Sequence, residues 1–401
     1  MDPDADHQWY LQSIHLLPVL MMKIERSIFM LLFWLMILIP APLVLFGWTG
    51  NTALEARSLM PYPTPSWDTA WRQETFQGIS AAFEDRMPLR NRLVGFRSSL
   101  ARQGLIPNPF HKVVFGNDDW LFVATSFDPH CPEDERSQIV SRLSVVADLL
   151  ESRGIRFVLS LVPNKASIHH AHLPDWILAE HDVAQERTTS MRAELASQGD
   201  WFMDITPAME ARLLDPERTP LYYPTDTHWT WNGAEVFVEA LVETLQPGLY
   251  DPDEVTLLKT VKANLDLDRL SGSSVERDLL YYSAKRPGTT DMVLDNQARS
   301  LPAVVTRKQG EPGRLIEGTT LIVRDSFWDH AGSVGHEYFE HLISVHANDA
   351  RQITLLAEAV ARADTVIFET GERKFCEVML ATIANERFPE VLVQALDSDN
   401  D

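Results

Sequence analysis

The sequence predicts an α/β body in which a mainly parallel sheet lies between two layers of helices. Two observations lead to this fold class. Short runs that are apolar throughout, such as FVLSLV within 156–162, have the length and continuity of strands that are buried on both faces. Helical patterns separate these runs, and such crossovers are the connections that parallel strands need.

The first part of the chain predicts a membrane anchor. Residues 28–48 carry no charge. At a rise of about 1.5 Å per residue, a helix of this length spans a hydrocarbon core of about 30 Å. Lys23 and Arg26 precede the segment and only Arg57 soon follows it, so the positive-inside bias places the N-terminus in the cytoplasm and the body outside. A cleaved signal peptide is the alternative.

These features divide the chain into four parts. We expect a cytoplasmic N-terminal tail at 1–27, a single-pass transmembrane signal anchor at 28–48, a tether rich in Pro, Ser and Thr at 49–70, and a folded body at 71–401.

Within the body, apolar spacing predicts the elements in order. The expected helices cover 137–153, 185–197 and 234–245, preceded by two helices within 76–105 that are joined at Pro88. The expected strands are a hairpin at 113–116 and 120–123 with its turn at 117–119, followed by 156–162, 201–205, 319–323 and 365–368. Residues 250–317 are polar and irregular, which predicts an excursion over the surface that carries substrate contacts.

Composition excludes some function classes. The 57 acidic residues outnumber the 35 Lys and Arg residues, for a formal net charge of −22, which argues against nucleic acid as a partner. Cys131 and Cys376 are the two cysteines, and both one disulfide and two free thiols remain open. The chain has no Gly-rich phosphate loop, and the spacing of His169, His170 and His172 matches no standard metal site, so we expect neither a cofactor nor a metal.

Asp325 and Ser326 directly follow the run LIVR at 321–324. Ligands gather at the carboxyl ends of parallel strands, so these two residues stand at a favoured place for a site. A turn or helix that starts there would expose the Ser326 hydroxyl beside backbone N–H groups that stabilise an oxyanion. Helix capping by the same two residues is the alternative.

Asp226 and His228 form a second candidate pair. In an extended segment, residues two apart project to the same side. A carboxylate beside an imidazole fixes the tautomer that a general base needs, and such a base activates a serine. A turn in which Asp226 bonds its own backbone and His228 packs among aromatic residues is the alternative.

Several short motifs together resemble the AlgX/AlgJ family of alginate O-acetyltransferases, which are SGNH-hydrolase-like. The matching segments, in order, are FEDRMPLR at 83–90, VFG and WLF at 114–116 and 120–122, VPNK at 162–165, TDTHW at 225–229, NGA at 232–234, DSF at 325–327 and ETGER at 369–373. The resemblance implies a three-layer SGNH-hydrolase-like, flavodoxin-like fold.

The resemblance also implies a function. Ser326 would be the nucleophile that carries the acetyl group, His228 the general base and Asp226 its partner. The acceptors would be hydroxyls of an exported polysaccharide, as in alginate biosynthesis. The anchor would sit in the inner membrane with the catalytic domain in the periplasm, and a membrane-bound O-acyltransferase would supply the acetyl groups.

Four further residues are candidate substrate contacts. Trp229 offers a ring for stacking on sugars, although buried packing is the alternative. Lys165 and Arg373 follow strand ends, where they are either substrate contacts or ordinary surface charges. Arg324 stands where the family usually has glycine, so it either strains the turn or faces an anionic substrate; Asp119 replaces a second family glycine, in the hairpin.

Two other functions use the same features. An acetylesterase would use the same triad with water as the acceptor, and the exclusion of water from the site separates it from a transferase. A noncatalytic scaffold would bind polysaccharide or hold an acetylation complex together, with Arg324 as the sign of lost activity.

Overall fold

The computed structural model describes residues 61–64, 66–86, 112–128, 131–292 and 301–398, together with scattered positions between 30 and 42 and between 95 and 106. The chain forms two compact units, 1–103 and 104–401.

In the first unit, helix α3 spans Gln73–Arg86, and the expected join at Pro88 lies outside the described residues. Most of the expected anchor at 28–48, and the expected tail at 1–27, lie outside the described residues. Among the residues that are described, no helix is both long and apolar enough to cross a bilayer.

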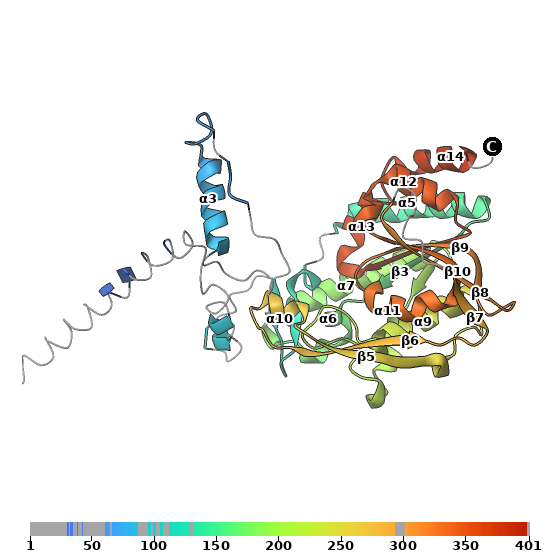
Figure 1. Cartoon of the computed structure of the whole chain (residues 1–401), viewed down its shortest axis with the longest axis horizontal. Coiled ribbons are helices and arrows are strands. Elements are labelled where there is room, and N and C mark those ends of the chain that lie inside the picture. The colour runs from blue at the N-terminus through green and yellow to red at the C-terminus, as the bar shows by residue number, and fades with distance from the viewer. Residues whose placement is uncertain are drawn as a thin grey trace, which may run out of the picture. The chain divides into compact units, whose positions relative to one another are not determined.

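The second unit is built on a seven-stranded mixed sheet with the strand order β4-β3-β11-β9-β10-β8-β7 (Figure 1). The first five of these strands are mutually parallel, and β8 and β7 continue the sheet in antiparallel fashion. The strands are β3 (Arg156–Val162), β4 (Phe202–Asp204), β7 (Thr289–Met292), β8 (Ala303–Gly310), β9 (Ile316–Arg324), β10 (Phe339–His346) and β11 (Thr365–Gly371).

This order confirms a mainly parallel α/β sheet but differs from the flavodoxin order. When the five parallel strands are numbered in chain order, their order across the sheet is 2-1-5-3-4, whereas flavodoxin-like sheets have the order 2-1-3-4-5. The last strand, β11, lies between β3 and β9 and pairs with both. As a result, the segments that follow β3, β9 and β11 meet at one edge of the sheet.

Helices cover both faces of the sheet. The helices are α5 (Glu133–Ser152), α6 (Lys165–Ile168), α7 (Leu178–Ala196), α8 (Thr206–Arg212), α9 (Trp231–Leu245), α10 (Asp266–Leu270), α11 (Trp328–Gly335), α12 (Ile353–Ala361), α13 (Phe375–Ala381) and α14 (Phe388–Ser398). Figure 1 places α5, α12 and α14 on one side of the sheet and α9 and α11 on the other.

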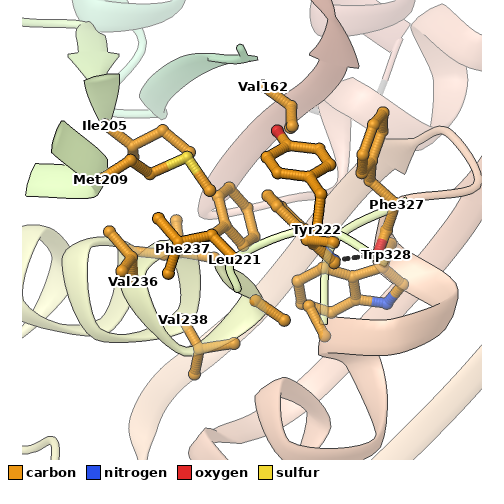
Figure 2. Close-up of a cluster of buried hydrophobic side chains, with 14 of the residues drawn as sticks. Val162, Ile205, Met209, Leu221, Tyr222, Val236, Phe237, Val238, Phe327 and Trp328 are labelled. Carbon is orange, nitrogen blue, oxygen red and sulfur yellow. Dashed lines mark hydrogen bonds between the residues drawn. The ribbon is translucent and has the colours of Figure 1, made fainter. Parts of the chain in front are cut away.

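Alternating strand residues supply the two cores. Along β3, Phe157, Leu159 and Leu161 pack with α5, α12 and α14, whereas Val158 and Val162 face the cluster of α8, α9 and α11. Figure 2 shows part of the second cluster, with Phe237 of α9 near Leu221 and Phe327 beside Tyr222. The continuous apolar pattern of these strands therefore has the expected cause, since both faces are buried.

The hairpin is β1 (Val113–Phe115) with β2 (Leu121–Val123), and its turn lies where the sequence predicts it. The N–H of Trp120 donates to Asn117 O at 3.0 Å, and both central residues of the turn have positive φ, 54° at Asp118 and 61° at Asp119. Asp119 thus adopts the left-handed conformation that favours glycine.

Residues 250–317 are more regular than their composition suggests. They form the two-stranded ribbon of β5 (Val255–Ala263) and β6 (Arg277–Ala284), the short helix α10 between these strands, and the antiparallel strands β7 and β8 of the main sheet. β5 is largely exposed, and its exposed side chains include the apolar Leu257 and Leu258.

Cys131 and Cys376 form a disulfide, which resolves the alternative left open by the sequence. The bond joins the segment before α5 to α13.

Candidate active site

Ser326 is the second residue after β9, at the edge where the carboxyl ends of the parallel strands meet. The carboxylate of Asp325 fixes this corner. Its Oδ1 accepts the N–H of Phe327 and its Oδ2 accepts the N–H of Gly371 at the end of β11, both at 2.8 Å. Helix α11 has Phe327 as its N-cap and no side-chain cap, so Asp325 ties together the backbone of the corner instead of capping the helix, and the Ser326 side chain points elsewhere.

The loop that carries Asp226 and His228 is closed by short antiparallel contacts. Tyr222 and Trp229 form an isolated β-bridge, and the N–H of Thr230 donates to Leu221 O at 2.8 Å before α9 begins. Gly233 permits this closure, because a Cβ at that position would lie 2.4 Å from Leu221 O. Residues 224–228 form a turn, not the extended segment we expected.

The turn nevertheless brings the two side chains together. Asp226 Oδ1 accepts the backbone N–H of His228 at 3.0 Å and lies 2.6 Å from His228 Nδ1. The self-bonded turn, proposed as an alternative to a catalytic pair, thus coexists with the carboxylate–imidazole contact.

His228 also reaches the serine. Its Nε2 lies 2.7 Å from Ser326 Oγ, across 98 positions of sequence. His228 and Ser326 are partly exposed, whereas Asp226 is buried. The three side chains form one continuous hydrogen-bonded chain from carboxylate to hydroxyl, which is the geometry by which an imidazole accepts a serine proton.

The surroundings set the proton affinities of this chain. Burial lowers the pKa of His228, but the hydrogen bond and charge of Asp226, with a further contribution from Asp266, raise it above its usual range. Burial raises the pKa of Asp226, yet the hydrogen bond and charge of His228 outweigh burial and keep that pKa far below its usual range. A carboxylate that stays ionised beside a more basic imidazole is what the base form of a triad requires.

Lys165 does not face a substrate, contrary to our expectation. It is buried, and its Nζ donates to the backbone carbonyls of Tyr223, Pro224 and Asp226 at 3.1, 3.0 and 2.7 Å. Burial lowers its pKa to about 7. The lysine therefore holds the loop that presents the carboxylate and the imidazole.

Trp229 does not stack on sugars, which corrects a second expectation. The ring is fully buried, and its Nε1–H donates to Phe327 O at 3.0 Å. This bond ties the loop that carries His228 to the residue after Ser326. Trp120 and Trp231 are also buried, so their rings are core packing as well.

Arg324 turns away from Ser326. Its Nη1 lies 2.7 Å from Asp329 Oδ1 and 3.3 Å from Asp325 O. The guanidinium thus pairs within its own corner, and the structure gives it no direct contact with the hydroxyl.

Arg373 is the substrate candidate that remains at the site. Its guanidinium Cζ lies 5.4 Å from the centroid of the Phe327 ring, and its charge acts on His228. Within the described part of the chain, no carboxylate pairs with it.

Two residues at the site escaped the sequence analysis. Asp266 of α10 lies 3.9 Å from His228 Nδ1, and the His330 ring of α11 lies 5.2 Å from the ring of His228. Burial and the nearby His228 lower the pKa of His330 to about 4. His330 follows Ser326 by four positions, and this spacing is the one sequence signal that could have found it; Asp266 had none.

A metal ion has one candidate place among the described residues. Ligand atoms of Asp226, His228 and Asp266 lie within 4.8 Å of one another. Each of the three side chains already has a protein hydrogen-bond partner at the site. His169 is buried elsewhere and accepts the N–H of Leu221 at 3.2 Å.

Comparisons with known proteins show what the chain is similar to. Residues 113–279 match the family model described as SGNH hydrolase-like domain, acetyltransferase AlgX. The probable alginate O-acetylase AlgJ of Pseudomonas syringae pv. tomato is 26% identical over 192 residues, 47% of this chain and 47% of the relative. AlgJ of Pseudomonas putida, described in the same words, is 32% identical over 142 residues, 33% of this chain and 34% of the relative. The chain thus matches about half or less of the length of these relatives.

Solved structures align over more of the chain. The O-acetyltransferase domain of Pseudomonas putida AlgJ aligns with 71% of this chain and 99% of its own, at 19% identity and a TM-score of 0.47. Bacillus cereus PatB1 with a sulfonyl adduct aligns with 65% of this chain and 96% of its own, at 16% identity and a TM-score of 0.47.

Proposed function

We propose that this chain, which belongs to the AlgX/AlgJ family of SGNH hydrolase-like proteins related to alginate O-acetylation, is an O-acetyltransferase that modifies a polysaccharide. The observation that supports the proposal best is the hydrogen-bonded chain of Asp226, His228 and Ser326, with heavy-atom distances of 2.6 and 2.7 Å.

The chemistry follows from these contacts in two half-reactions. In the first, His228 Nε2 takes the Ser326 proton as Oγ attacks the carbonyl carbon of an acetyl donor. The imidazolium then returns that proton to the leaving group, and the acetyl group stays on Ser326. In the second, His228 takes the proton of a sugar hydroxyl, whose oxygen attacks the acetyl carbon. The bond to Oγ breaks, and the proton moves from His228 to Ser326.

Not every backbone N–H group after β9 is available to stabilise an oxyanion. The N–H of Phe327 is engaged by Asp325, so it is not free for a substrate. The N–H of Ser326 has no acceptor within the described residues, and Arg373 supplies a positive charge nearby. We assign the oxyanion contact to the Ser326 N–H and an electrostatic contribution to Arg373.

The setting of the reaction follows from the resemblance and from the sequence before the body. We propose that residues 28–48 anchor the chain in the inner membrane, that the catalytic domain works in the periplasm, and that a membrane-bound O-acyltransferase supplies the acetyl groups. The uncharged segment and the Lys23–Arg26 flank support this topology.

A serine-directed fluorophosphonate probe and a chromogenic acetyl ester test the proposal. The wild-type protein should be labelled and should turn over the ester, whereas Ser326→Ala should do neither. Labelling of neither protein would favour a noncatalytic scaffold. Ester turnover without transfer to any added polysaccharide would favour an acetylesterase, and near-wild-type turnover by His228→Ala would exclude its role as base.

A further inference from the structure

One stretch of the 250–317 excursion makes repeated contacts with the loop that carries the Asp226–His228 pair. We call residues 264–277 the clamp segment; it contains α10 and the turn that leads into β6. The loop and the clamp segment are about 40 positions apart in sequence, yet three consecutive loop residues, Thr225, Asp226 and Thr227, each bond to the segment.

Asp266 makes two of these contacts. Its backbone N–H donates to Asp226 Oδ2 at 3.1 Å, so it occupies the carboxylate oxygen that faces away from His228. Its side chain accepts the backbone N–H of Thr227 at 2.8 Å through Oδ1 and the Thr227 hydroxyl through Oδ2. Asp266 therefore fixes Asp226 and the residue between Asp226 and His228.

Asp268 makes the third contact and anchors the clamp segment itself. Its Oδ2 accepts the Thr225 hydroxyl at 2.6 Å and pairs with Arg277 Nε at 2.9 Å. The N–H of Ser273 donates to Asp268 O at 2.8 Å, which closes the turn. Because Asp268 is fully buried, its carboxylate depends on such partners for its stability in the fold.

Asp266 also changes the electrostatics of the base. Its Oδ2 lies 3.9 Å from His228 Nδ1, so the imidazole faces two carboxylates. The other charged or titratable groups around His228 are Arg373 after β11, His330 on α11 and, beneath the loop, Lys165 on α6. Two negative charges favour the imidazolium that forms when Ser326 loses its proton, whereas the positive charge of Arg373 opposes it.

We propose that the clamp segment holds the catalytic loop in its reactive geometry and that Asp266 is a positioning residue that acts through both Asp226 and His228. The inference rests on the proposed acetyl-transfer function, because a base whose orientation and charge are set in this way has a use only where Ser326 reacts. The excursion thus contributes the second carboxylate of the site and not only surface for a substrate.

Asp266→Asn tests the electrostatic part of this role. The amide keeps an oxygen for Thr227 but removes the charge, so the imidazolium loses part of its stabilisation. The fluorophosphonate labelling rate at its plateau should fall by between about tenfold and 100-fold, because the imidazolium that forms on attack loses one of its two neighbouring negative charges. The acid limb of the pH–rate profile should also move to lower pH, since His228 then binds its proton less tightly.

The matched control is Asp278→Asn. Asp278 lies on β6 of the same excursion and pairs with Lys262 at 2.8 Å, with both side chains more than half exposed. This variant should keep the wild-type labelling rate and acid limb. A wild-type rate and acid limb in Asp266→Asn would overturn the proposal.

A second pair of variants keeps the test decisive if Asp266→Asn does not fold. Thr227→Val removes the hydroxyl that Asp266 holds but leaves both carboxylates, so labelling should slow while the acid limb stays in place. Thr227→Ser restores the hydroxyl and should restore the rate. Labelling of Thr227→Val at the wild-type rate would contradict the clamp. If the wild-type protein is not labelled at all, the proposed function fails instead, and the two failures are thus distinguishable.

Discussion

Replacing Asp226 with Asn tests the electrostatic core of the proposed site. Asp226 Oδ1 accepts two N–H groups of His228, from the backbone and from Nδ1, and Oδ2 accepts the N–H of Asp266. All three groups at this carboxylate are donors. An amide has one oxygen, so its NH₂ group must face at least one N–H, and either a hydrogen bond or the correct imidazole tautomer is lost.

The loss of charge sets the expected magnitude. Opposite charges about 4 Å apart attract by about 4 kcal/mol at an effective dielectric constant of about 20. That energy is present when His228 is an imidazolium and absent when it is neutral, so it lowers the barrier to attack by Ser326. At about 1.4 kcal/mol per tenfold in rate, Asp226→Asn should slow the reaction by about 1,000-fold.

The assay is the second-order rate of fluorophosphonate labelling, with turnover of a chromogenic acetyl ester as the second readout. Asp397→Asn is the control, because it removes the same charge from an exposed pair with Arg153 on the far face of the sheet and should change neither rate. A rate for Asp226→Asn close to that of wild type, in a protein with a wild-type circular dichroism spectrum, would refute the assignment of Asp226 as the partner of His228.

Three other predictions follow from the contacts around the site. Because His228 has a raised pKa, labelling of the wild-type protein should fall as pH decreases, with its midpoint above the ordinary imidazole value of 6.5; a midpoint below that value would contradict the two-carboxylate environment. Trp229→Phe leaves the buried Phe327 carbonyl without its donor and should lower the free energy of unfolding in urea by about 1 to 3 kcal/mol, whereas an unchanged value would show that this bond contributes nothing. The unfolded chain keeps the Lys165 proton up to about pH 10.5, whereas the folded chain releases it near pH 7. Between these two pH values, the free energy of unfolding of the wild-type protein should therefore rise with pH relative to that of Lys165→Met, by at most about 1.4 kcal/mol per pH unit. A pH-independent difference would contradict the burial of this lysine.

The fold was largely predictable because burial on both faces of a sheet requires a local pattern of apolar residues in the sequence. The FVLSLV run of β3 and the spacing of buried residues along α5, from Ile139 to Leu150, are each explained by the layer that they contact. The hairpin turn was predictable for the same reason, since Asn117–Asp119 carry turn residues between two apolar runs. The strand order was not predictable, because the insertion of β11 between β3 and β9 depends on contacts between distant segments.

The candidate site was also predictable only in part. Residue chemistry singled out Ser326, His228 and Asp226, and the structure brings their side chains within hydrogen-bond distance. Our interpretation of the neighbouring residues was wrong where burial decides the role of a side chain. Trp229 follows His228 directly and Lys165 follows the end of β3, but both side chains point into the protein and support the loop.

Asp266 was missed for the opposite reason. It lies in a polar segment without periodicity, and its role arises from contacts about 40 positions away. No pattern in a single sequence reports such a contact, because neither helical nor strand spacing links the two segments.

The acetyl-enzyme itself gives the most direct test of the central claim. Wild-type protein is mixed with an excess of a chromogenic acetyl ester, quenched in acid while turnover proceeds, digested and analysed by mass spectrometry. The account predicts one acetyl group on the peptide that contains Ser326, its removal when a hydroxyl acceptor is added before the quench, and its absence in His228→Ala. Turnover at full rate with no acetyl group on Ser326, or with the group on another residue, would contradict it.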